Sequence, residues 1–215
     1  MLIWTRVQLP PPPPIKVDMK KLILRKLYRL VLLIVVVIYY YWPKKYVVLS
    51  VAIAFAVVLT LDLIRLTKPA ANDVVRKIFK PFAIFMRYIA KREELKDLSG
   101  TSYSLMGCLI IVALIPKVVG ITAILFNIFG DLFATIVGKT IGKVKITKDK
   151  TLEGSLACFI SMMVVVLWSH SRLSLPWFAG FVGAIAGTLI ELVPLKINDN
   201  LTIPILSGVF MWLLI

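Results

Sequence analysis

Seven apolar runs, each close to the length needed to cross a lipid bilayer, divide the chain. With their flanks they span roughly the 17–25 residues that a transmembrane helix requires. Composition agrees, because 60% of the residues are hydrophobic, whereas soluble domains contain about 45–50%. We therefore predict an all-α polytopic membrane protein with about seven transmembrane helices, although the shorter runs leave six or eight open. The runs centre on Leu27–Trp42, Tyr46–Leu61, Leu105–Ile115, Ile121–Val137, Leu156–Trp168, Trp177–Ile190 and Leu201–Ile215.

Two segments lie outside these runs. Residues 1–20 include the proline run Pro10–Pro14, which favours polyproline II and predicts an extended or disordered tail. Residues 21–215 then form a single transmembrane domain. Within it, Asp73–Lys96 alternates apolar and basic residues, which predicts an amphipathic helix in the headgroup plane, interrupted near Pro81. No small-residue cleavage site follows the first run, so we expect it to remain as a span.

The net charge of +15 is distributed as membrane topology predicts and does not require a nucleic-acid partner. With seven spans, most cations fall on one side, which the positive-inside rule makes cytoplasmic. The carboxylates map to or near that side too. Plain outer loops alone would also give this asymmetry; the alternative is an inward-facing active site. The crowded side comprises the N-terminal tail, Arg65–Ser102, Gly138–Gly154 and Glu191–Asn200, and the opposite side carries Lys44, Lys45, Lys117 and Arg172.

Polar residues enter the fourth apolar run around Asp131. This carboxylate lies about 12 Å along a helix from Lys139, a depth that is costly unless the group is paired or faces water. Helical spacing places it on one narrow stripe of small and polar residues. Close helix packing explains the glycines of that stripe but not the aspartate. The stripe comprises Asn127, Asp131, Thr135 or Ala134, Gly138 and Gly142.

Basic residues follow this stripe. They can neutralise a triphosphate while Asp131 holds Mg²⁺, which is the division of labour that phosphoryl transfer requires. The same lysines can equally be topogenic. They are Lys139, Lys143, Lys148 and Lys150.

A second polar cluster surrounds Glu191, which follows two glycines at four-residue spacing, Gly183 and Gly187. This spacing predicts a close helix contact leading to a carboxylate. Further on, Pro204 fits the first turn of a last helix. The free N–H groups at the start of that helix would favour an anion. Alternatively, the segment is simply a polar turn with a helix cap. The expected caps are Asn200 or Thr202.

These motifs, in this order, resemble those of the CTP-dependent lipid kinases, which include dolichol kinases, phytol kinases and CTP-dependent diacylglycerol kinases. Two positions depart from the family pattern: Arg29 stands where histidine is usual, and Asn198 stands where the last loop usually reads Asp-Asp-Asn. The matching segments are Gly130-Asp131, Gly138-Lys139, Gly142, Lys150–Ser155, Glu191 and Asp199–Pro204, with Arg25–Arg29, Asp62–Arg65, Arg92–Glu94 and Gly100–Tyr103 before them.

The resemblance implies a membrane-embedded kinase that transfers a phosphoryl group from CTP to a polyprenol or dolichol-type alcohol or to diacylglycerol, at the cytoplasmic face. Its cofactor would be Mg²⁺, with Asp131 as metal ligand. The catalytic candidates are Asp131, Glu191 and Asp199. The nucleotide-binding candidates are Arg25, Lys26, Gly138, Lys139, Gly142, Lys143, Lys150, Thr151, Glu153, Gly154, Ser155 and Asn200.

Three alternatives stay open on the sequence. A related family of cytidylyltransferases makes CDP-activated lipids and shares the Gly-Asp and Lys-Thr segments, but it releases pyrophosphate where a kinase releases CDP. A transporter would also place a carboxylate within a span, yet the acidic groups cluster at one interface and no internal repeat is evident. A purely structural membrane protein would not account for Asp131. Cys108 and Cys158 fall within apolar runs and predict no function.

Overall fold

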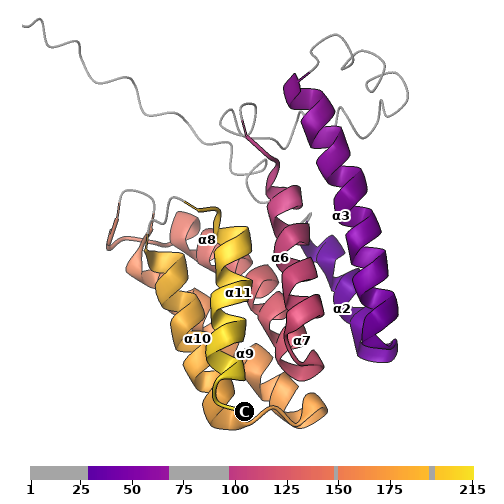
Figure 1. Cartoon of the computed structure of the whole chain (residues 1–215). Coiled ribbons are helices and arrows are strands. Elements are labelled where there is room, and N and C mark those ends of the chain that lie inside the picture. Colours follow the sequence, from indigo (N-terminus) through magenta and orange to yellow (C-terminus); the bar gives the residue numbers. More distant parts are fainter. Residues whose placement is uncertain (1–28, 68–96, 148–149, 194–196) are drawn as a thin grey trace, which may run out of the picture.

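The computed structural model describes residues 29–67, 97–147, 150–193 and 197–215, and these form a bundle of helices (Figure 1). Within these ranges no β-strand occurs, and the one isolated bridge joins Lys145 to Thr151. The all-α prediction is therefore confirmed for the described part of the chain. The predicted tail, the predicted interfacial helix, and Arg25, Lys26 and Lys148 lie outside the described residues.

The described chain alternates helices with short connections. In chain order the elements are the 3₁₀ turn η1 (Arg29–Val31), α2 (Leu32–Tyr41), α3 (Lys44–Thr67), α6 (Gly100–Leu114), α7 (Lys117–Leu125), the π-helical turn η3 (Phe126–Gly130), α8 (Asp131–Thr140), α9 (Leu152–Leu173), α10 (Trp177–Leu192) and α11 (Asp199–Trp212).

One continuous helix forms the centre of the bundle. It runs through α7, η3 and α8 from Lys117 to Thr140. Of its most apolar 18-residue stretch, 78% is buried within the protein. Helices α6, α9 and α11 pack along it, whereas α3 lies at the edge (Figure 1). Only 17% of the most apolar 18-residue stretch of α3 is buried. A helix with so much apolar surface exposed is suited to a lipid environment. The central helix therefore carries Asp131 into the core of the bundle.

Three of the described helices are long and apolar enough to span a membrane. They are Lys44–Ile64, Lys117–Thr140 and Leu152–Leu173. Three further apolar helices are shorter: Leu32–Tyr41, Gly100–Leu114 and Trp177–Leu192. The count of about seven spans stays a prediction.

Short connections reverse the chain and gather particular helix ends together. The turns after α2, α6 and α9 lie at one end of the bundle, near the C-terminus marked in Figure 1. The turn after α9 is closed by Ser174 in the left-handed conformation (φ 58°). The opposite end then holds the last turns of α3, α8 and α10 and the first turns of α6, α9 and α11. We call this opposite end the site end.

Glycines allow the helices nearest the site end to approach closely. A Cβ on Gly154 of α9 would lie 2.9 Å from the Ala134 carbonyl oxygen and 3.1 Å from the Cα of Gly138, both on α8. On α10, Gly183 faces Met211 and Gly187 faces Met162. The close helix contact predicted for Gly183 and Gly187 is therefore confirmed.

The shared location of the site-end loops makes a topological prediction. Single cysteines at Lys143 and Ile197, both exposed at the site end, should be labelled by a membrane-impermeant thiol reagent from the same side of the bilayer, which the positive-inside rule makes the cytoplasmic side. Cysteines at Lys45 and Arg172 should be labelled only from the other side. The native Cys108 and Cys158 are buried and serve as an unlabelled background. Labelling of Lys143 and Ile197 from opposite sides would contradict this topology.

Candidate active site

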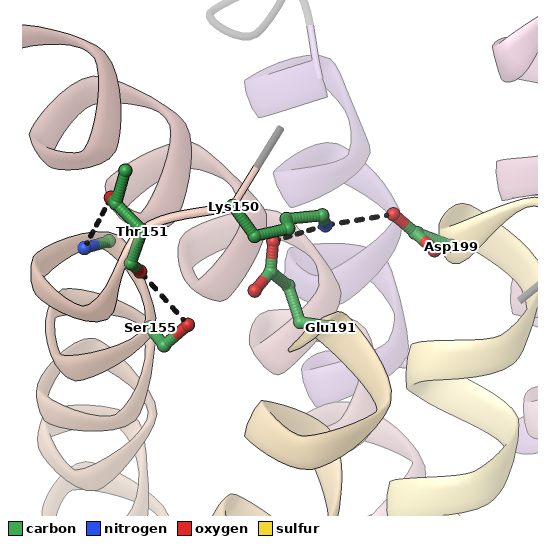
Figure 2. Close-up of polar contacts among 6 residues, drawn as sticks. Lys150, Thr151, Ser155, Glu191 and Asp199 are labelled. Carbon is green, nitrogen blue, oxygen red and sulfur yellow. Dashed lines mark hydrogen bonds and ion pairs between the residues drawn. The ribbon is translucent and has the colours of Figure 1, made fainter. Parts of the chain in front are cut away.

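An ion cluster joins three separate elements at the site end. The Lys150 ammonium donates a hydrogen bond of 2.5 Å to Glu191 Oε1 and one of 3.3 Å to Asp199 Oδ2. Figure 2 shows the lysine side chain reaching between the two carboxylates, which come from the end of α10 and the start of α11. The Glu191 side chain is only 5% exposed, and those of Lys150 and Asp199 are 22% and 33% exposed. Three of the residues predicted from the sequence thus form one cluster.

The connection between α8 and α9 holds Lys150 in place through its backbone. The Lys150 carbonyl accepts hydrogen bonds from the N–H groups of Ile146 and Thr147, at 3.0 and 3.2 Å. Where the connection enters α9, Leu152 N–H donates to the Val144 carbonyl. The Glu153 carboxylate accepts from Val144 N–H at 3.2 Å. Glu153, predicted to bind nucleotide, therefore has a contact that fixes the loop carrying Lys150.

Neighbouring carboxylates set the charge of Lys150. Burial disfavours its charged form, but the charges and hydrogen bonds of Glu191 and Asp199 outweigh burial and raise the pKa of Lys150 above its usual value. A raised pKa on a cationic group gives a stabilisation that is complete below the unfolded-state pKa of about 10.4 and is lost only as pH rises through the folded-state value. The cluster therefore keeps its cation throughout the neutral range.

The first turn of α9 lies beside this cluster. Thr151 caps the helix, because its side-chain oxygen accepts from Gly154 N–H at 3.2 Å, and the Ser155 hydroxyl donates to the Thr151 carbonyl at 3.2 Å (Figure 2). Gly138 and Gly142 face the Thr151 side chain; a Cβ on Gly138 would lie 3.0 Å from Thr151 Oγ1. These glycines therefore serve the contact between α8 and α9. A nucleotide contact by any of these residues stays a prediction.

The start of α11 differs in two respects from the sequence expectation. Its N-cap is Asn198, whose side chain accepts from Asn200 N–H. Neither Asn200 nor Thr202 is the cap, and Pro204 lies beyond the first turn, inside the helix. The helix begins earlier than expected because Asp199 is already helical. The Asn200 amide instead donates to the Gly100 carbonyl at 3.2 Å and joins α11 to α6.

A second carboxylate, Asp62, organises the start of α6. It is buried near the end of α3, and its Oδ2 accepts from Ser99 N–H at 2.7 Å and from the Ser102 hydroxyl at 2.6 Å. With the bond from Asn200 to Gly100, this contact ties α3, α6 and α11 together. These serines were not among the predicted site residues. The signal was present, since Ser99 has the side chain of a helix cap and Asp62 is a charge within an apolar run.

Asp131 lies deeper than the ion cluster. It is buried and is the first residue of α8, directly after η3. The Met162 side chain lies against both Gly130 on the central helix and Gly187 on α10, so these two glycines are at a similar depth in the bundle. Glu191 is four residues beyond Gly187, so Asp131 lies about 4.5 Å deeper than Glu191, roughly one helical turn.

Two more of the predicted cations lie near the end of α8, outside the ion cluster. Lys139 and Lys143 are exposed, on the last turn of α8 and just after it. Within the described ranges no group of three or more His, Cys, Asp or Glu side chains is arranged to hold a metal ion. Mg²⁺ usually takes one or two carboxylates and completes its shell with water and substrate phosphates. Glu191 and Asp199, which share one cation, fit that requirement.

Removing the cation should destabilise the protein. Lys150→Met leaves Glu191 buried without its partner, and we expect the free energy of unfolding in detergent to fall by about 1–3 kcal/mol. The matched control is Lys139→Met, which removes an exposed cation and should change stability by about 0.5 kcal/mol or less. Adding Glu191→Gln to Lys150→Met should restore part of the loss. Equal stability of Lys150→Met and the wild-type protein would rule out the ion cluster.

Comparison with known proteins agrees with the motifs. No family model and no solved structure matches this chain. A CTP-dependent diacylglycerol kinase 1 from Schizosaccharomyces pombe is 26% identical over 182 residues, covering 76% of this chain and 79% of the relative. The protein of the same name from Eremothecium gossypii is 29% identical, over 76% of this chain and 57% of the relative. A probable chloroplastic phytol kinase from Triticum aestivum is 32% identical, but it matches only 58% of this chain and 46% of its own length. The resemblance predicted from the sequence motifs is therefore confirmed, and this chain is related to the CTP-dependent lipid kinases.

Proposed function

We propose that this chain is a membrane-embedded lipid kinase that transfers the terminal phosphoryl group of CTP to the hydroxyl of a lipid alcohol. The acceptor is an isoprenoid alcohol of the polyprenol or dolichol type or a diacylglycerol, and the site faces the cytoplasm. One observation carries the proposal beyond similarity: the cluster of Lys150, Glu191 and Asp199 lies where helix N-termini gather, one helical turn above a buried aspartate.

The site end is suited to a polyphosphate. Helices α6, α9 and α11 all begin there, and the N-terminal end of a helix carries partial positive charge that favours anions. Lys150 adds a full charge beside the starts of α9 and α11, and Lys139 and Lys143 are exposed nearby in sequence. Phosphate oxygens can compete with the two carboxylates for the Lys150 ammonium, and the cation can thus hold the nucleotide when it binds.

Asp131 is suited to the acceptor. It lies about one turn deeper than Glu191, on the side of the bundle core from which a lipid hydroxyl would rise. In the proposed reaction this carboxylate orients the hydroxyl and accepts its proton. The hydroxyl oxygen forms a bond to the γ-phosphorus, the bond from that phosphorus to the β,γ-bridging oxygen breaks, and CDP leaves with the electron pair. The proton passes from Asp131 to solvent.

Magnesium is part of the proposal. Glu191 and Asp199, or Asp131 as predicted from the sequence, would hold it. When bound with the nucleotide it would neutralise charge on the phosphate oxygens. Lys150 would then be released from its carboxylate partners and become available to the nucleotide.

We expect chelation of divalent cations to abolish turnover while leaving the protein folded.

The products distinguish this function from its nearest alternative. Purified protein in mixed micelles should convert γ-labelled CTP and a lipid alcohol into a labelled lipid phosphate and CDP. A cytidylyltransferase would instead act on a lipid phosphate such as phosphatidate, release pyrophosphate and transfer label from α-labelled CTP to the lipid. Absence of lipid phosphate formation from diacylglycerol, phytol and a polyprenol, with the nucleotide varied, would overturn the proposal.

Asp131→Asn gives the sharpest test of the site. Asparagine keeps the size of the side chain but cannot accept the proton or supply charge, and it is easier to bury in a membrane. We therefore expect the variant to fold, as checked by its unfolding transition in detergent. Its kcat should fall about a thousandfold, which corresponds to about 4 kcal/mol of transition-state stabilisation. Asp97→Asn removes an exposed carboxylate and serves as the control. Near wild-type turnover by Asp131→Asn would move the role to Glu191 or Asp199.

A further inference from the structure

The amide of Asn127 is buried in the middle of the central helix without hydrogen bonds. The residue is 1% exposed, and among the described residues neither its Oδ1 nor its Nδ2 has a partner. Leaving a polar group unpaired inside a protein costs about 1–3 kcal/mol. An apolar residue of the same shape would avoid that cost. The amide is therefore better explained by something that it binds than by the packing of the protein.

The backbone around Asn127 is also irregular. It lies within η3, the π-helical turn Phe126–Gly130 that interrupts the central helix immediately before Asp131. Single π-helical turns within α-helices are often found at functional sites, because the extra residue in the turn redirects the neighbouring side chains. This observation is independent of the missing hydrogen bonds. Both single out the same turn.

The contacts of the central helix place Asn127 below Asp131. A Cβ on Gly208 of α11 would lie 3.4 Å from the Ala123 side chain, and α11 runs antiparallel to the central helix. One turn toward the site end on both helices brings Asn127 level with Pro204, and Asp131 lies one turn nearer the site end on the central helix. A π-helical turn closes over about four to five residues, so Asn127 and Asp131 lie about one turn apart on the same side of the central helix. The amide and the carboxylate thus follow one line into the bundle.

We propose that Asn127 selects the acceptor lipid by binding an ester carbonyl that lies next to the hydroxyl phosphorylated at Asp131. This inference rests on the proposed lipid kinase function and names the acceptor as a diester glycerolipid. In a diacylglycerol, an ester group begins on the carbon adjacent to the one bearing the free hydroxyl. The separation of the two oxygens suits groups one helical turn apart. Asn127 Nδ2 donates to the carbonyl oxygen while Asp131 orients the hydroxyl.

The chemistry of the amide disfavours a phosphate or an isoprenoid alcohol at this position. Asn127 is neutral, and Lys150 of the proposed phosphate site lies at the site end, at least one turn farther out, so among the described residues that site offers no cation to a phosphate at this position. An isoprenoid alcohol has only hydrocarbon beside its hydroxyl and would leave the amide unpaired. A site that hydrogen-bonds its substrate discriminates strongly against an analogue that lacks the bonding group.

The test compares three acceptors in two variants. Wild-type protein and Asn127→Leu are assayed in mixed micelles with CTP and either 1,2-dioleoylglycerol, its dioleyl ether analogue without carbonyls, or phytol. The replacement should lower kcat/KM for the diester about 10–100-fold, as loss of one buried hydrogen bond predicts. Turnover of the ether and of phytol should stay within about threefold of wild type. Because the orphaned amide is gone, the unfolding temperature of Asn127→Leu should not fall.

Controls separate selection from packing. Ile128→Val changes volume in the same turn without removing a polar group, and it should affect all three acceptors alike. Asn127→Ala provides a second variant if leucine does not fit. An equal loss for all acceptors, or a lower unfolding temperature with unchanged preference, would overturn the inference and leave the kinase function intact. Failure of the wild-type protein to phosphorylate any lipid alcohol would instead overturn the kinase function itself, and the inference with it.

Discussion

The contact of Lys150 with Glu191 and Asp199 is the interaction on which the site end depends. Glu191 is 5% exposed at the end of an apolar helix, where an unpaired carboxylate would be costly. Lys150 offsets that cost, and through Asp199 it also fixes the start of α11. A buried pair of this kind is weak evidence for stability as such, because its desolvation is expensive. Its consequence is geometric: it holds the α8–α9 connection against α10 and α11, and it keeps two carboxylates and a cation within reach of one ligand.

The alternating direction of the helices explains why one end of the bundle can serve anions. Helices α6, α9 and α11 begin where α3, α8 and α10 end, so three positive helix ends meet the charged connections. Each start is capped by a side chain, Ser99, Thr151 or Asn198. The caps satisfy some backbone N–H groups and fix where each helix begins, and Asp62 and Asn200 then tie α6 to its neighbours. The same polar residues that terminate the apolar runs thereby build a rigid surface.

Local sequence patterns predict the helices well because the cost of exposing a polar backbone in lipid leaves few alternatives. The cost of burying charge also identifies Asp131 and Glu191 as unusual, and Lys150 follows from its place in the motif. Long-range pairing is a different matter. Nothing in the periodicity indicates that Lys150 meets Glu191, 41 residues away, or that Ser99 meets Asp62, 37 residues away. The cap of α11 was misplaced by two residues or more for a related reason: Asn198, Asn200 and Thr202 can all cap a helix, and tertiary contacts such as that of Asn200 with Gly100 decide among them.

Polarity decreases with depth along the line from the site end into the bundle. Exposed lysines lie outermost, the partly buried ion cluster comes next, Asp131 lies about one turn deeper, and the neutral Asn127 lies one turn below that. The cost of burial rises steeply from an amide to a charge, so this order is the one that a membrane bundle can sustain. It also matches the two substrates of a lipid kinase. A nucleotide approaches from water and needs cations, whereas a lipid alcohol approaches from the bilayer and offers a hydroxyl with apolar or ester groups beneath it. In the proposed reaction Asp131 would lie where the two approaches meet and would act on the lipid hydroxyl at that depth.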